Sequence, residues 1–184
     1  MADNAGNMEN SEILIDEQVE RLIFCRSFFP YLSAALVGAR GFQTSPYYLA
    51  NGLDLEFRFS SPITPEYLAR VNDLGYWMNQ NFVIRLYSLL ECGGHIGGNK
   101  SIVWSRPGAQ AVDIVRRLRN KIGHGSADVD AGSCDDQRLY NRIVEHFGLN
   151  PEELPWTGQR YPLPIDKVLI PLAQQCREYV LAMG

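Results

Sequence analysis

The chain has 184 residues, of which 46% are hydrophobic and 21% are charged, a composition typical of globular proteins and unlike that of disordered or fibrous ones. Its net charge of -4 argues against nonspecific coating of nucleic acid, because that binding depends on many lysine and arginine contacts to phosphate. No apolar run reaches membrane-spanning length, and the first ten residues lack the basic flank and apolar core of a secretion signal. We therefore expect a cytoplasmic protein with no membrane partner, in which any contact with RNA is local.

The four cysteines are scattered and include no Cys-x-x-Cys pair. They are Cys25, Cys92, Cys134 and Cys176. This spacing indicates neither a disulfide framework nor a zinc ribbon. We expect reduced cysteines, no metal and no other cofactor.

The first part of the chain is predicted to be a tail followed by a helix. Residues 1–11 are small and polar, which is typical of a flexible N-terminal tail, and residues 12–184 are long enough for a single domain. From residue 12 to about residue 39, apolar side chains recur at steps of three and four, the pattern of an amphipathic helix. Pro30 should kink or break this helix, because proline lacks the N–H group that a helix interior requires.

A long loop is expected after the first helix, over residues 41–62. Within it, the alternation of apolar and polar residues over 53–59 suits a short strand or an extended segment. Thr64-Pro65-Glu66 then predicts a helix start, with a hydroxyl cap, a proline where its missing N–H is harmless, and an acid in the first turn. This second helix should run to Glu91, where Gly93-Gly94 ends it.

Three further helices are predicted. The third begins near Ala109, the fourth spans 136–147, and the last spans 166–183 with a kink at Pro171. A connector over 155–164 contains three prolines. The pattern as a whole predicts an all-α bundle of about five helices.

The third helix carries a polar motif beside its core face. The core positions step by three, three and four residues and are Val112, Val115, Leu118 and Ile122. At about 100° per residue, Asn120, His124 and Arg117 fall roughly opposite this stripe, whereas Arg119 flanks it. The motif is therefore predicted to be a polar helix face with one semi-buried arginine beside it.

Arginine, asparagine and histidine in this order can cleave RNA without a metal. A guanidinium group stabilises the charge of a pentacoordinate phosphate, and an imidazole moves the proton of a ribose 2'-hydroxyl. The run from Arg116 to Lys121 also places four of the chain's 17 cations on two helical turns. Such a cluster supplies a local phosphate-binding patch on an acidic protein.

The segment Arg119-Asn120-x-x-x-His124 resembles the signature of the HEPN superfamily. The resemblance covers the helical region from about residue 13 to 183, but only this six-residue motif is specific. It implies a helical bundle that dimerises, so that two motifs face each other across a cleft, and in many members a metal-independent endoribonuclease. The context it implies is a toxin, phage-defence or stress-response role, with an antitoxin or regulatory protein as a possible partner.

Carried onto this chain, the resemblance assigns roles to individual residues. Arg119 would bind the scissile phosphate, His124 would transfer the proton, and Asn120 would orient one of them by hydrogen bonds. Two copies of His124 in a dimer would act as base and acid, leaving 2',3'-cyclic phosphate and 5'-hydroxyl ends. Substrate phosphates would be gathered by the neighbouring cations. These are Arg116, Arg117 and Lys121.

Several assignments have alternatives. Arg117 competes with Arg119 for the phosphate, because the spacing of seven residues places it beneath His124 on the helix. Glu91 is the candidate supporting acid of the preceding helix, but it equally suits a surface carboxylate at a helix end. The cations are also explained as a solvated face near a helix C-terminus, with His124 as a capping residue.

Two further alternatives concern activity and control. A non-catalytic module of the same fold that binds RNA, a nucleotide or a partner protein is consistent with the acidic net charge. In HEPN toxins silenced by a nucleotidyltransferase, a tyrosine often follows two residues after the histidine. This chain has Ser126 there, which makes that mode of control doubtful.

Three weaker patterns are better explained by structure. The segment 94–101 resembles a P-loop with a displaced glycine, but it follows a helix and not a strand. Cys92-x-x-His95 has half the spacing of a zinc site and no second pair. The aromatic residues at helical spacing are more typical of a core than of base stacking.

Overall fold

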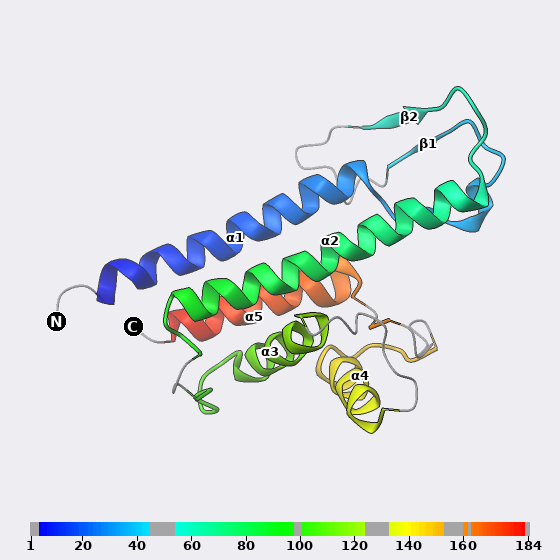
Figure 1. Cartoon of the computed structure of the whole chain (residues 1–184). Helices are drawn as coiled ribbons and strands as arrows, with labels where there is room; N and C mark the ends of the chain where they lie inside the picture. The colour runs from blue at the N-terminus through cyan, green and yellow to red at the C-terminus, as the bar shows by residue number, and fades with distance from the viewer. Residues whose placement is uncertain are drawn as a thin grey trace. The chain divides into compact units, whose positions relative to one another are not determined.

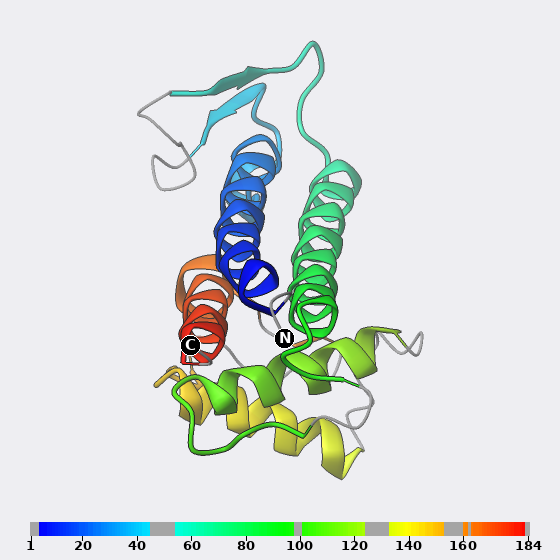
Figure 2. The same cartoon turned by 90° about the vertical axis from the view of Figure 1, so that its left-hand side faces the viewer.

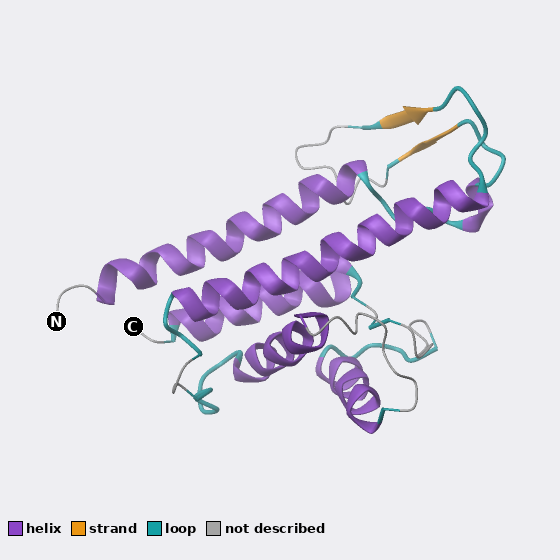
Figure 3. Ribbon diagram, viewed as in Figure 1, coloured by secondary structure: helices purple, strands orange, loops and turns teal. Residues whose placement is uncertain are grey.

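A computed structural model describes residues 4–44, 54–97, 101–123, 133–152, 160–161 and 163–182. Across these residues the chain forms five α-helices and one two-stranded sheet (Figures 1 and 3). In chain order the elements are α1 (Asn4–Phe28), β1 (Gly41–Gln43), β2 (Glu56–Arg58), α2 (Pro65–Cys92), α3 (Ala109–Gly123), α4 (Cys134–His146) and α5 (Ile170–Leu181). The predicted all-α class is confirmed. No helix in these described ranges has the length and apolar character needed to cross a bilayer.

Contacts divide the chain into two compact units, whereas the sequence predicted one domain over residues 12–184. The first unit comprises Met1–Gln18 and Phe82–Gly184, and the second comprises Val19–Asn81. Both boundaries fall inside long helices, α1 and α2, so each of these helices contributes to two separate clusters of contacts.

Helix α1 begins earlier than the sequence predicted. Residues 4–11 belong to the helix, whereas the sequence predicted a helix from residue 12, after a flexible tail over residues 1–11. Ser11, at the end of this stretch, is buried. The helix ends at Phe28, two residues before Pro30, as expected of a residue that cannot donate the next helical hydrogen bond.

The second unit combines the later part of α1, the strands and the start of α2. Asn72 clamps the segment after α1, because its Oδ1 accepts from the Leu32 backbone N–H at 2.8 Å and its Nδ2 donates to the Leu32 carbonyl at 2.9 Å. The strands β1 and β2 pair antiparallel, with Phe42 opposite Phe57 and their rings stacked 4.7 Å apart. Figure 2 shows this hairpin in cyan. The alternation predicted for 53–59 is therefore a short strand.

Helix α2 starts at Pro65, as its sequence predicted. The Thr64 hydroxyl accepts a hydrogen bond from the backbone N–H of Tyr67 at 3.2 Å. Backbone and Thr64 hydrogen bonds also lower the pKa of Glu66. At the other end, Gly94 has a positive φ of 70° just after the last helical turn, the usual conformation of a terminating glycine.

The first unit contains the larger core. It is built from α3, its neighbours α4 and α5, and the last turns of α2 (Figure 1). Side chains with no accessible surface there include Leu86, Leu90, Val112, Val115, Leu118, Ile143, Leu169 and Leu172. Close approach is enforced at Gly108, where an added Cβ would lie 1.9 Å from the backbone oxygen of Gln175. The start of α3 is thus packed directly on α5.

The last helical segment begins with a π-helical turn, Ile165–Leu169, followed by α5. Pro171 lies in the first turn of α5, where its missing N–H costs least. The kink at Pro171 stays a prediction, and the bonding changes from π-helical to α-helical just before this residue. Cys176 on α5 is fully buried, and burial raises the pKa of its thiol.

Candidate functional site

Helix α3 has the two faces that its sequence predicted. Val112, Val115 and Leu118 of the predicted core stripe are buried, whereas its fourth member, Ile122, is only half-buried. Arg117 and Asn120 are exposed, and Arg119 is half-buried. The polar face continues into Lys121, in the last turn of the helix. The helical register therefore carries Arg117, Asn120 and Lys121 along one line toward the C-terminus of α3.

The carboxylate of Asp113 organises the arginines at the start of this face. Asp113 has no accessible surface, and it accepts hydrogen bonds from Arg116 Nη2 at 2.6 Å and from Arg117 Nε at 2.8 Å. Arg142 of α4 adds a third bond, from its Nη1 to the same Oδ2 that Arg117 uses. Burial would raise the pKa of Asp113, but the hydrogen bonds and charges of Arg117 and Arg116 lower it below its ordinary value. Asp113 is therefore a buried anion that binds three cations.

A second buried carboxylate joins α3 to α4. Asp136 accepts a hydrogen bond from the Tyr161 hydroxyl at 2.7 Å and forms an ion pair with Lys121 Nζ at 2.5 Å, both through its Oδ1. Asp136 lies in the first turn of α4, where the backbone N–H of Asp136 bonds the cap residue Ser133. The two helices are thus connected at two points, through Asp113 and through Asp136.

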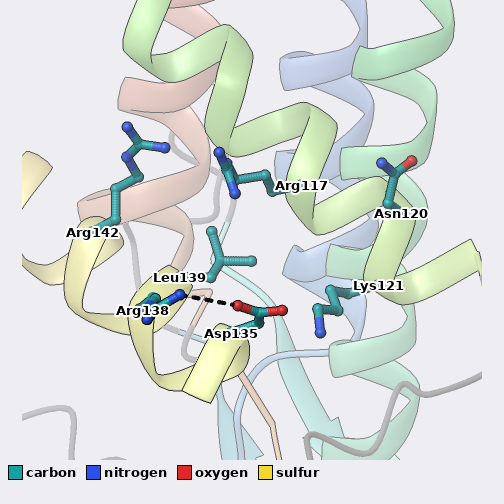
Figure 4. A pocket seen from close by; sticks show the side chains of 7 residues that line it. All are labelled: Arg117, Asn120, Lys121, Asp135, Arg138, Leu139 and Arg142. Carbon is teal, nitrogen blue, oxygen red and sulfur yellow. Dashed lines mark hydrogen bonds and ion pairs between the residues drawn. The ribbon is translucent and has the colours of Figure 1, made fainter. Parts of the chain in front are cut away.

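Between these two connections lies a pocket of about 580 Å³. Its lining residues are Arg117, Asn120 and Lys121 of α3 and Asp135, Arg138, Leu139 and Arg142 of α4. Figure 4 shows the guanidinium groups of Arg117 and Arg142 on one side of Leu139, with Arg138, Asp135 and Lys121 on the other. The lining has four cations and one carboxylate, and that carboxylate, Asp135, contacts Arg138 at 3.5 Å. We call this site the α3–α4 pocket.

The predicted site residues divide into three groups. Arg117, Asn120 and Lys121 line the α3–α4 pocket, whereas Arg116 contacts Asp113 and does not line it. Arg119 lies beside the pocket, because its guanidinium stacks over the Tyr87 ring at 5.0 Å and donates to Asn120 Oδ1 at 3.2 Å. Arg119 is thus linked to the pocket through the amide of Asn120.

The remaining predicted residues are Glu91 and His124. Glu91 is exposed in the last turn of α2 and lies against Gly97, where an added Cβ would be 2.9 Å from its Cγ. His124 directly follows the last residue of α3 in the sequence, but it falls in the segment 124–132, outside the described residues, as does Ser126.

The charged residues of this site that the sequence did not predict are Asp113, Asp135, Asp136, Arg138 and Arg142. Asp113 had a local signal, because residues three and four apart share a helix face and Arg116 and Arg117 follow at those spacings. Arg142 had none, since it is 29 residues from Asp113 and reaches it only through the packing of α4 on α3. Within the described ranges, no three His, Cys, Asp or Glu side chains are grouped as metal ligands would be.

No protein-family model matches this chain, and no curated protein or solved structure shows significant similarity to it.

Proposed function

We propose that the protein is a metal-independent endoribonuclease of the HEPN type, which binds RNA phosphates in the α3–α4 pocket. The observation that supports this proposal is the charge of the pocket. Four cations line it in a chain whose net charge is -4, and cationic side chains are the usual ligands of nucleic-acid phosphates. The pocket also includes Asn120 of the sequence motif.

In this proposal the chemistry belongs to Arg119, Asn120 and His124. His124 accepts the proton of a ribose 2'-hydroxyl, and the resulting 2'-oxygen attacks the adjacent phosphorus. Arg119 stabilises the added negative charge on the phosphate oxygens. The hydrogen bond from Arg119 to Asn120 at 3.2 Å orients the guanidinium relative to the polar face of α3.

The second half of the reaction requires a proton for the leaving group. As the bond between phosphorus and the 5'-oxygen breaks, His124 of the partner subunit donates its proton to that oxygen. The products are a 2',3'-cyclic phosphate and a 5'-hydroxyl, so bonds and protons balance without water or metal. This step makes a homodimer part of the proposal, because one protomer supplies a single His124.

Substrate phosphates outside the reacting bond belong to the pocket. Arg117 and Lys121 were predicted for this role, and Arg138 and Arg142 join them from α4. Arg116 acts indirectly, since it contacts Asp113 and is not among the residues that line the pocket. The proposed biological setting is RNA cleavage by a toxin, a phage-defence protein or a stress-response protein, with an antitoxin as partner.

The decisive experiment is cleavage of total RNA and tRNA by the purified chain in EDTA. We expect new 5'-hydroxyl ends and cyclic phosphates, and a loss of about 100-fold or more in rate for His124→Ala, the usual size of a general acid–base contribution. Arg58→Gln is the matched control, because Arg58 is 80% exposed and pairs only locally with Glu56. Activity that needs a divalent metal, or that survives His124→Ala, contradicts the proposed mechanism.

The roles of the two competing arginines separate kinetically. Arg119→Gln should lower kcat with little change in KM, because its proposed contact forms in the transition state. Arg117→Gln should mainly raise KM, because its contact is with bound substrate phosphate. The opposite pattern would assign the scissile phosphate to Arg117.

A second candidate function is supported by the pocket's size. A volume of about 580 Å³ falls in the range of pockets that bind small ligands, so the same residues suit a module that binds RNA or a nucleotide without turnover. Such a module retains salt-dependent binding and produces no new RNA ends. Binding without cleavage in the assay above would select this function.

A further inference from the structure

We infer that the α3–α4 pocket binds the doubly charged phosphate of a phosphate monoester, with the guanidinium groups of Arg117 and Arg142 as its principal ligands. The inference deepens the proposed function by naming the phosphate class that this pocket accepts. The source of the monoester is either the end of an RNA chain or a free mononucleotide.

The guanidinium groups of the two arginines lie close together. Arg117 Nε and Arg142 Nη1 bond one and the same oxygen of Asp113, so these two nitrogens lie no farther apart than two hydrogen-bond lengths, roughly 6 Å. Each guanidinium carries five N–H donors, and Asp113 accepts from only one of Arg117 and one of Arg142. Both residues line the pocket, and Figure 4 shows their guanidinium groups on the same side of Leu139.

The guanidinium groups of Arg117 and Arg142 are held in place before a ligand binds. Asp113 is fully buried behind the arginines, while the side chains of Arg117 and Arg142 are 52% and 40% exposed. The carboxylate therefore fixes the two cations from the core side and leaves the solvent side for an anion. Two guanidinium groups fixed as a pair suit the several oxygens of one phosphate.

The pocket and its ion pairs carry an excess of positive charge. The cations of the pocket and its ion pairs are Arg116, Arg117, Lys121, Arg138 and Arg142, and the carboxylates are Asp113, Asp135 and Asp136. Five cations against three carboxylates leave two positive charges among these described residues. An internal RNA phosphate carries one negative charge, whereas a phosphate monoester carries about 1.5 to 2 at neutral pH. The monoester matches the pocket better.

The test measures binding by the full chain carrying His124→Ala, so that cleavage does not interfere. One labelled oligoribonucleotide is prepared with a 5'-phosphate, with a 3'-phosphate or with hydroxyl ends, and its affinity is measured by fluorescence anisotropy. Adenosine monophosphate and adenosine are compared by calorimetry as the second arm. We expect the phosphorylated form of at least one pair to bind about tenfold more tightly than its hydroxyl counterpart.

Variants assign that preference to the pocket. Arg142→Gln should abolish the preference, and Arg138→Gln should reduce it without affecting folding, because Arg138 is 79% exposed and its contact with Asp135 is long, at 3.5 Å. Arg58→Gln should leave the preference unchanged. A preference seen only with oligonucleotides identifies an RNA end, and one seen only with the mononucleotide identifies a free nucleotide.

Equal affinity of the phosphorylated and hydroxyl forms in both arms overturns the inference, as does a preference that survives both pocket variants. These outcomes are independent of the cleavage assay. A chain that cuts RNA but shows no preference for terminal phosphates supports the proposed function and contradicts this inference. A chain that binds terminal phosphates without cutting RNA supports this inference and contradicts the proposed function.

Discussion

The Asp113 cluster and the β-hairpin both pair arginine with a carboxylate, but in opposite surroundings. Asp113 has no accessible surface and holds arginines from two helices. Glu56 and Arg58 lie two residues apart on β2, with side chains 51% and 80% exposed. An ion pair in water contributes little to stability, whereas a buried carboxylate destabilises the fold unless cations pair with it. The same residue types therefore contribute to stability and site geometry only where packing removes them from water.

The largest expected effect is the loss of the buried carboxylate. Asp113→Ala leaves three arginines close together without their anion and opens a small cavity in α3. We expect the free energy of unfolding to fall by about 3 kcal/mol, the lower part of the range for breaking a buried ion pair, because the arginines are partly exposed. Urea unfolding followed by circular dichroism measures this change, and a loss below about 1 kcal/mol would remove Asp113 as the organiser of the cluster.

A pair of glycine substitutions extends the contrast between packed and open positions. Gly108→Ala should destabilise the protein by about 2 to 3 kcal/mol, because its φ is 75° and the new Cβ would meet the Gln175 backbone at 1.9 Å. Gly148→Ala should cost about 1 kcal/mol, since its φ is 60° but nothing lies within 4 Å of the new Cβ. Thermal unfolding of the two variants side by side gives both values. Equal losses would mean that α3 is not packed on α5 as described.

Acid should remove the stability that Asp113 supplies. Its folded pKa is lowered by the arginines, so its contribution is present above the unfolded value of about 3.9 and is lost as the pH falls through the folded pKa. We expect the difference in unfolding free energy between the wild type and Asp113→Asn to be constant from pH 7 to 5 and to shrink below about pH 4. A difference that grows in acid would contradict the sign of this shift.

The smallest effect is expected on the hairpin. The hydrogen bond and charge of Arg58 lower the pKa of Glu56, yet the pair is solvated, and exposed pairs contribute little. Glu56→Gln should leave the urea midpoint unchanged within error. A clear decrease would show that the comparison with Asp113 has overstated the role of burial.

The helices whose signals are local could be predicted from the sequence alone. The start of α2 at Pro65 follows from Thr64 and Glu66, and the core stripe of α3 follows from the spacing of Val112, Val115 and Leu118. The half-buried position of Arg119 also followed from helical geometry. These features depend on residues within one or two turns of each other, which a linear sequence displays directly.

The pocket and the start of α1 could be recognised only in the tertiary structure. Arg142 reaches Asp113 because α4 packs on α3, and no pattern in the chain marks a contact across 29 residues. Residues 4–11 are helical although their composition is polar, and Ser11 at the end of this stretch is buried. Burial turns Asp113 from one of many helix-surface acids into the anchor of three arginines, and burial is a property of the packed chain.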